Sequence, residues 1–152
     1  MIITIQPDKF TIDNVFFHEQ NKNNMTDSNF IRIIYSSKTF TLNGIFLYIQ
    51  IQNLKQEKIF NKYKYTFSIK ENSRLISFIQ ELESYIMNQI SNHPFHSNKE
   101  PNYKLSEQFN NGELKMYKTN EEKLHNHFIL KISGVWSTND YYGITYKIFN
   151  HP

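Results

Sequence analysis

The residue types that most often carry enzymatic chemistry are present in this sequence but are not arranged as a site. Histidines stand close together in the stretches HPFH and HNH, and imidazole is a good zinc ligand. His125 and His127, however, precede an apolar run, and no carboxylate cluster of ligand spacing stands beside them. This spacing favours solvated loop histidines, and we predict no metal site.

Nucleotide-binding loops and nucleophilic side chains are also missing from the sequence. The 4 glycines are too few for a glycine-rich phosphate loop, and no serine nucleophile elbow occurs. Glu81 and Glu83 lie two residues apart in a helical pattern, so their carboxylates point to different sides. Cysteine is absent, which removes disulfides, thiolate metal sites and a cysteine nucleophile. We therefore predict that the protein is not an enzyme and has no cofactor.

Aromatic and basic residues are the more informative types, because 16% of the residues are aromatic. Exposed rings stack on nucleic-acid bases for about 1 to 3 kcal/mol each, while cations neutralise the phosphates. Alternation of rings and lysines is also typical of any half-exposed strand, so a purely structural interpretation stands beside this one. The candidate nucleic-acid-binding residues are Arg32, Lys38, Phe46, Tyr48, Lys62, Lys64, Lys131, Tyr141 and Lys147.

Period-two alternation predicts the strands that must position these side chains. In the second of them, Ile45, Leu47 and Ile49 share a core face, while Phe46 and Tyr48 point outward. In the third, Tyr63, Tyr65, Phe67 and Ile69 are expected to point inward. The predicted strands are residues 30–37, 41–52, 61–70, 112–118, 128–136 and 141–149.

The period changes to three and four residues in a single clear helix. Its apolar positions are Leu75, Ile79, Leu82, Ile86 and Ile90, and Asn72 or Ser73 can cap its first amides. A short helical turn is expected at the stretch YKLSEQF. Residues 1–29 have no certain structure, although MIITI is compatible with an edge strand and VFFHEQ with a strand.

This order of elements predicts a mainly β protein of the α+β kind, with one domain spanning residues 1–152. Three strands, one helix and two or three further strands match an OB-like Greek-key β-barrel, in which a helix lies between strands 3 and 4. A mixed α+β sheet with a helix inserted midway has the same order, so both architectures remain open.

The only tryptophan lies near the turn STND between the last two strands. Trp136 is in the core phase unless a bulge at Gly134 turns it outward, and we predict a core position. Tyr141 is expected to point outward and Tyr142 to be buried.

Composition sets broad limits on location and partners. The net charge of +3 is too mild to identify a nucleic-acid-binding protein. No apolar run approaches the roughly 18 residues that cross a bilayer, and the first residues lack a signal-peptide pattern. With cysteine absent, these features predict a cytoplasmic protein without a membrane partner.

Three stretches carry a resemblance to a known group of proteins: FIRIIYSSKTFTLNGIFLYIQI, EPNYKLSEQFNNGELKMYK and FILKISGVWSTNDYYGITYKIF. They resemble small OB-fold-like single-stranded DNA-binding proteins of nucleocytoplasmic large DNA viruses and cytoplasmic linear plasmids. Gly134, Trp136, Tyr142 and Gly143 are the fixed points of the last stretch. The resemblance implies DNA replication of a viral or plasmid genome as the setting. The N-terminal segment has no counterpart in it, and no acidic tail follows IFNHP.

We therefore expect a single-stranded DNA-binding viral protein that uses stacking and phosphate contacts. Replication proteins and a second copy of the chain are the further partners considered. The competing hypothesis is a structural or protein-interaction module of a virus that uses the same exposed rings as a dry interface. Salt separates the two, because phosphate contacts weaken as salt rises.

Overall fold

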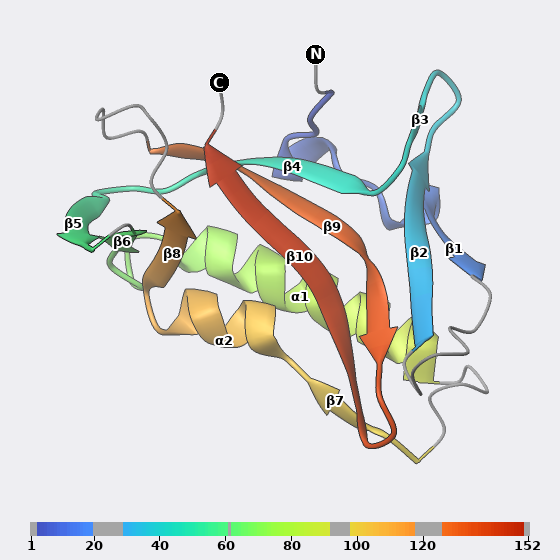
Figure 1. The fold of residues 1–152 in the computed structure, drawn as a ribbon. Coiled ribbons are helices and arrows are strands. Elements are labelled where there is room, and N and C mark those ends of the chain that lie inside the picture. The colour runs from blue at the N-terminus through green and yellow to red at the C-terminus, as the bar shows by residue number, and fades with distance from the viewer. Residues whose placement is uncertain (1–2, 20–28, 61, 92–97, 118–125, 151–152) are drawn as a thin grey trace.

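The computed structural model describes residues 3–19, 29–60, 62–91, 98–117 and 126–150 of the chain. Its largest unit is a sheet of seven strands with the order β1-β2-β9-β10-β7, in which β3 pairs with β2 and β4 pairs with β9 (Figure 1). The strands of this sheet are β1 (Val15–Glu19), β2 (Asn29–Ser36), β3 (Thr41–Leu42), β4 (Ile45–Gln50), β7 (Glu100–Asn102), β9 (His127–Ser137) and β10 (Tyr141–Asn150).

The long strand β9 organises this sheet. One of its edges pairs with β10 along almost the whole length. Its other edge is shared, because residues 127–132 pair with β4 and residues 134–137 pair with β2. All of these pairs are antiparallel, whereas the short β7 runs parallel to β10.

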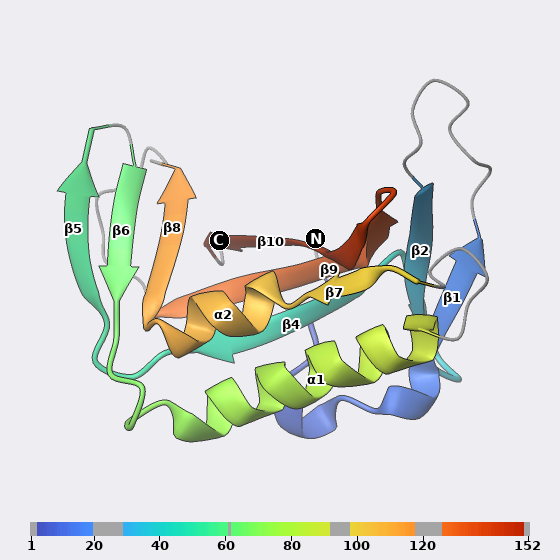
Figure 2. The same cartoon turned by 90° about the horizontal axis from the view of Figure 1, so that it is seen from below.

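A second, smaller sheet has the strand order β5-β6-β8. Its strands are β5 (Lys55–Ile59), β6 (Lys62–Thr66) and β8 (Glu113–Tyr117). Figure 2 shows this small sheet at one end of the molecule and β1 with β2 at the other. Both extend away from helix α1 (Ser73–Ser91), and β9 and β10 lie between them.

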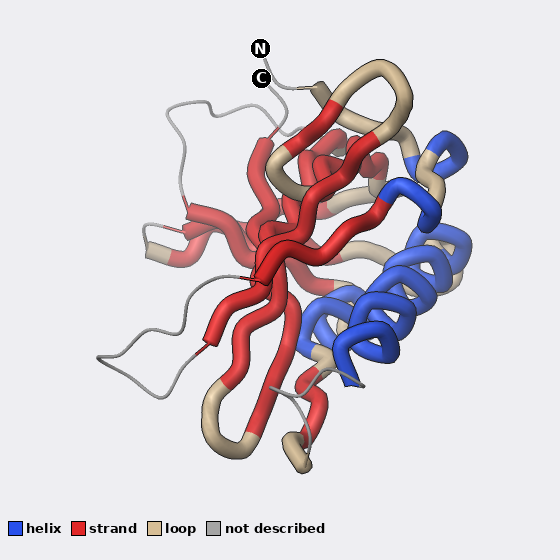
Figure 3. Tube along the Cα trace, turned by 90° about the vertical axis from the view of Figure 1, so that its right-hand side faces the viewer, coloured by secondary structure: helices blue, strands red, loops and turns tan. Residues whose placement is uncertain are grey.

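Both α-helices lie on the same side of the strands (Figure 3). Helix α1 carries an apolar face because its residues Ile79, Leu82, Ile86 and Ile90 recur at helical spacing, and all four are at most 2% exposed. Helix α2 (Lys104–Asn110) adds the fully buried Leu105 and Phe109. The helices therefore cover one face of the large sheet, and within the described ranges no α-helix covers its other face.

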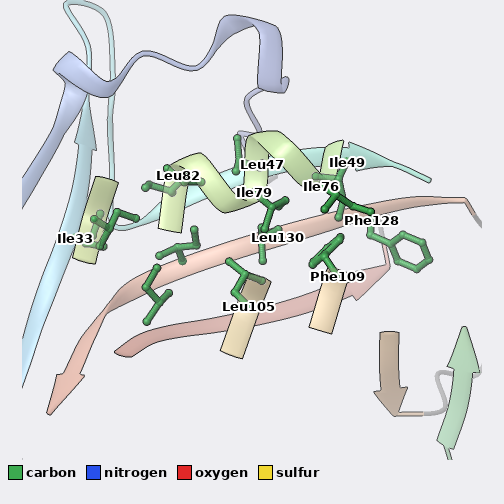
Figure 4. Close-up of a cluster of buried hydrophobic side chains, with 14 of the residues drawn as sticks. Ile33, Leu47, Ile49, Ile76, Ile79, Leu82, Leu105, Phe109, Phe128 and Leu130 are labelled. Atoms are coloured by element: carbon green, nitrogen blue, oxygen red, sulfur yellow. The ribbon is translucent and has the colours of Figure 1, made fainter. Parts of the chain in front are cut away.

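The core lies between this helix layer and the large sheet (Figure 4). Each strand of the sheet contributes every second residue to the core, since successive residues of a strand point to opposite faces. On β4 and β9 these positions are fully buried: Ile45, Leu47, Ile49, Phe128, Leu130 and Ile132.

Two polar side chains inside this layer connect distant elements. Asn72 precedes α1, and its amide bonds both the N–H (2.7 Å) and the carbonyl (3.1 Å) of Gln52. Glu83 on α1 is fully buried and accepts the N–H groups of Leu105 (3.2 Å) and Ser106 (2.9 Å). Because the first amides of a helix have no partner within it, Glu83 caps α2 and holds it against α1.

The predicted strands and helix are largely confirmed, with local differences that have physical causes. The predicted strand at residues 41–52 is divided, because Gly44 has a φ of 136° and breaks the extended chain between β3 and β4. The strand predicted at residues 61–70 ends at Thr66, so Ile69 is 47% exposed instead of inward. Strand β5 escaped prediction because its sequence, KQEKI, has one apolar residue.

The part of the chain that the structure describes is mostly β with two α-helices, which confirms the α+β prediction but not the predicted barrel. Among the described residues the strand pairings form no closed ring, since the large sheet ends at β1 and β7. The helix at YKLSEQF is confirmed as α2, so two α-helices lie between β6 and β8 instead of one.

Candidate nucleic-acid interface

The face of the large sheet that points away from the helices, here called the outer face, carries most of the predicted site residues. Cross-strand pairs in the sheet share a face, and the register identifies its members. On β2, β4, β9 and β10 the aromatic and basic members are Phe30, Arg32, Phe46, Tyr48, Lys131, Trp136, Tyr141, Lys147 and Phe149. None of these side chains belongs to the core cluster or packs against it.

A β-bulge on β9 gives Trp136 its place on this face. The register with β10 shifts between Thr145 and Tyr146, so that Thr145 pairs with Gly134 and Tyr146 with Ile132. Ser133 is therefore an extra residue on β9, and every residue after it faces the opposite way from a regular strand. The prediction of a core position for Trp136 is wrong for this reason, and the bulge condition named with it is met.

Glycines under two aromatic rings let them lie directly against the sheet. Gly134 pairs with Arg32, and a Cβ placed on it would lie 2.5 Å from Cζ of Phe30. Gly143 pairs with Trp136, and a Cβ there would lie 2.9 Å from Cζ2 of the indole. A Cβ at Gly134 would also collide with the carbonyl oxygen of Ile31, and one at Gly143 would lie 3.0 Å from that of Asn102, so the close packing of both the strands and the rings requires glycine at these positions.

Further along β9, two lysines stand side by side. Lys131 pairs with Lys147 on β10 and with Phe46 on β4, and its Nζ lies 5.4 Å from the centre of the Phe46 ring. Like charges directly opposite each other destabilise a sheet. Within the described residues, neither lysine forms an ion pair. The pair thus concentrates positive charge beside an aromatic ring.

The next outward row holds Tyr48, Ile129 and Phe149. Ile129 is only 1% exposed although it lies outside the core cluster, with the two aromatic residues paired to either side of it. The Tyr48 hydroxyl bonds Nδ1 of His127 at 2.6 Å, and the two rings stack with centroids 5.2 Å apart. This contact fixes the orientation of a half-buried tyrosine on the outer face.

Arg32 lies between the Trp136 row and the lysine pair. Its guanidinium donates to Oδ1 of Asn43 at 3.0 Å and lies 5.8 Å from the centre of the Phe30 ring. Both contacts are to uncharged groups, so the positive charge of Arg32 is oriented but not neutralised by them.

The four strands that build the outer face contain no aspartate or glutamate. Acidic residues are found elsewhere, for example Glu57 and Glu113 in the small sheet and Glu81 and Glu107 on the helices. Glu19 and Glu100 lie in the end strands β1 and β7, so it is the four central strands that present basic and aromatic side chains without a carboxylate.

Three of the predicted residues lie apart from this face. Lys38 is exposed in the turn between β2 and β3. Lys62 and Lys64 are in β6 of the small sheet, so the expectation that they share a surface with Phe46 and Tyr48 is wrong. Lys64 forms an ion pair with Glu113 at 3.2 Å, and the side chain of Lys62 lies outside the described part.

The remaining predictions for the last strand are confirmed. Tyr141 is 49% exposed at the start of β10, whereas Tyr142 is 4% exposed. Burial raises the pKa of the Tyr142 hydroxyl, and the nearby Tyr103 raises it further. On the helix side of the same strand, burial raises the pKa of Tyr146, as do the charges of Glu83 and Glu107. Its hydroxyl donates to Oε1 of Gln108 at 2.6 Å, which ties β10 to α2.

Residues that sequence reasoning did not select are Phe30, Trp136, His127 and Phe149. Phe30 lies two residues before Arg32 in the same predicted strand, so strand alternation alone could have predicted it on the same face. Trp136 required the bulge, and His127 required the contact with Tyr48, neither of which has a local sequence signal.

Other surface features carry less chemistry. One depression is lined by Asn53, Lys55, Thr66 and Glu71, among others, and another by Gln6, Tyr48, Arg74 and Phe78, among others. No group of three or more potential metal ligands is found among the described residues, and His93, His96 and His125 lie outside them. Neither described α-helix has both the length and the apolar character needed to cross a membrane.

Comparison with protein-family models, with characterised proteins and with solved structures finds no match for this chain.

Proposed function

We propose that the protein binds single-stranded DNA on the outer face of its large sheet. The observation that carries this proposal is the row formed by Phe46, Lys131 and Lys147, in which two lysines without an acidic partner among the described residues lie beside a ring. Aromatic faces and ammonium groups side by side match a ligand whose bases are unstacked and whose backbone is anionic.

The arrangement favours a single strand over a duplex. A duplex hides the faces of its bases, so half-buried rings on a sheet have nothing flat to stack on. Stacking on rings and contacts to phosphates do not read the edges of the bases, so sequence dependence is expected to be weak. The resemblance to single-stranded DNA-binding proteins of DNA viruses and linear plasmids agrees with this proposal but is not needed for it. An OB-like fold and a role in viral or plasmid DNA replication are part of the same proposal.

The proposal is tested by fluorescence anisotropy with a labelled oligothymidine and a duplex of equal length. We expect tighter binding of the oligothymidine, with log affinity falling by about 0.7 per neutralised phosphate for each tenfold rise in salt. Equal or better binding of the duplex would overturn the proposal. Salt-resistant binding of a protein partner, without binding of the oligonucleotide, would support the protein-interaction hypothesis instead.

Charge reversal locates the site. The variant Lys131→Glu/Lys147→Glu is expected to bind roughly 100-fold more weakly, because two charged contacts of about 1.5 kcal/mol each are lost. The matched control is Lys55→Glu/Lys58→Glu, which changes the net charge equally at exposed positions of β5 in the small sheet. Equal losses in the two variants would show that overall charge, and not the outer face, is responsible.

A further inference from the structure

Apart from Tyr141 at the start of β10, the aromatic rings of the outer face form two groups that are separated along β9. Phe30 and Trp136 form the first group, at the C-terminal end of β9. Phe46, Tyr48 and Phe149 form the second group, toward its N-terminal end. Here the first group, together with the glycines beneath it, is called the platform.

Positively charged residues occupy the rows between these groups. In the direction from Trp136 to Ile129, the outward rows hold first the platform, then Arg32 with Thr145, then Lys131 with Lys147 and Phe46, and finally Tyr48 with Phe149. On β10, which has no extra residue, six residue steps from Gly143 to Phe149 at about 3.3 Å each separate the first row from the last, or roughly 20 Å of strand. Rings at both ends and cations between them therefore follow the axis of β9.

The platform is built to keep its rings in place. The indole of Trp136 lies over Gly143, where a Cβ would approach it to 2.9 Å, and Phe30 lies over Gly134. Both side chains are only partly buried and stand apart from the hydrophobic core. A ring with one face against a glycine and another part open to solvent is suited to stack on a base with little loss of side-chain freedom.

We infer that the bound strand runs along β9, with a base stacked on Trp136 at one end, its phosphates beside Arg32, Lys131 and Lys147, and further bases on Phe46 and Tyr48. This inference rests on the proposed function and adds the direction of the ligand and its principal stacking residue. A path across the strands is less suited to the pattern, because β4, β9 and β10 together span only about 10 Å.

The path also sets a minimum ligand length. A track of about 20 Å with stacking at both ends calls for about four nucleotides, at the lower end of the range for single-stranded DNA-binding domains. Affinity for oligothymidines should therefore rise steeply up to about four to six nucleotides and only slightly beyond.

The experiment uses the single tryptophan of the chain as its own reporter. Addition of an oligothymidine to the unaltered protein should quench the fluorescence of Trp136 with the same midpoint as the anisotropy titration. Trp136→Ala should weaken oligothymidine binding about 10-fold. In this variant the affinity should also stop rising at a shorter oligonucleotide length than in the unaltered protein. Trp136→Phe should recover most of the affinity, because it retains a flat ring.

Two further variants test whether the loss of binding is specific to the position of the Trp136 ring. Phe60→Ala is the matched control, since this ring is 91% exposed beyond the end of β5 and away from the outer face; it should bind normally. Gly143→Ala, which keeps Trp136 but displaces its ring, should bind more weakly if its thermal unfolding shows an intact fold. Normal binding by Trp136→Ala, together with unchanged tryptophan fluorescence when the unaltered protein is titrated, would overturn the inference.

The proposed function and the inference fail in different ways. Absence of salt-sensitive oligonucleotide binding by the unaltered protein removes both. Binding that depends on Lys131 and Lys147 but not on Trp136 leaves the proposed function intact and removes the platform and the path along β9.

Discussion

The outer face of the large sheet and the small β5-β6-β8 sheet have similar sequences but different surfaces. Lysines alternate with tyrosines in β6, much as lysine alternates with apolar and aromatic residues in β9 and β10. In the small sheet, Lys64 pairs in register with Glu57 of β5 and with Lys115 of β8, and it forms an ion pair with Glu113 of β8. In the large sheet, Lys131 faces Lys147 and Phe46.

The residues on the neighbouring strands therefore decide whether a lysine in a strand can bind an anionic ligand. Lys64 has a carboxylate within ion-pair distance, so its charge is already neutralised. Among the described residues no carboxylate pairs with Lys131 or Lys147, and two adjacent ammonium groups without one favour a bound anion. The same contrast holds for rings, because Tyr65 of β6 is 3% exposed and packs edge-on against Phe128, while Phe46 stays half-buried on the outer face.

The largest expected effects concern the stability contributed by a core ring and by a surface ring. Tyr65→Ala should lower the free energy of unfolding by about 3 to 5 kcal/mol, because it empties a core position. Phe46→Ala should cost roughly 1 kcal/mol of stability, since the ring is only partly buried. Urea unfolding measures both values. Equal destabilisation by the two variants would contradict the division into core ring and surface ring.

The next effect sharpens the contrast between the lysines. Lys147→Glu places a carboxylate opposite Lys131, which should raise the free energy of unfolding by about 0.2 to 1 kcal/mol. The same change should weaken oligothymidine binding by about 10-fold or more, because a charged contact worth about 1.5 to 3 kcal/mol is lost. Unfolding and anisotropy measurements on one protein sample test both signs. A loss of stability would show that Lys147 is not strained by its neighbour.

Salt dependence distinguishes the two sheets without relying on absolute affinity. Lys131→Ala/Lys147→Ala should reduce the slope of log affinity against log salt by about 1.4, since two phosphate contacts disappear. Lys64→Ala should leave the slope unchanged, because that cation is already paired. A series of anisotropy titrations across salt concentrations gives the slopes, and a similar reduction in both variants would remove the distinction.

The smallest effect is expected from the ion pair of the small sheet. Lys64 and Glu113 are both partly exposed, with side-chain exposures of 29% and 39%. Exposed pairs of this kind contribute about 0.2 to 1 kcal/mol, so Lys64→Ala should shift the urea midpoint only slightly. Its oligothymidine affinity should match that of the unaltered protein, and a clear loss would return Lys64 to the binding site.

Much of the secondary structure follows from local patterns. Helix α1 was predicted from the spacing of five apolar residues, and strands β4, β9 and β10 from alternation, because periods of 3.6 and 2 are direct consequences of backbone geometry. β5 and β7 were missed, since β5 is mostly polar and β7 has three residues, and both are defined by the strands they pair with.

The candidate site was predictable only in part. Arg32, Phe46, Tyr48, Lys131, Tyr141 and Lys147 lie on the outer face because strand phase places them there. Lys62 and Lys64 were assigned to the same surface on the assumption that the second and third predicted strands share one sheet face, whereas β4 and β6 belong to different sheets.

By itself, the sequence determined which residues alternate, where the helix lies and which types of side chain are available for binding, since these depend on neighbours along the chain. Only the tertiary structure decided that Trp136 faces outward, that Lys131 stands beside Lys147 and that Lys64 is neutralised by Glu113. The two lysine outcomes depend on strand pairing, and the outward position of Trp136 depends on a bulge that reverses the face of every residue that follows it.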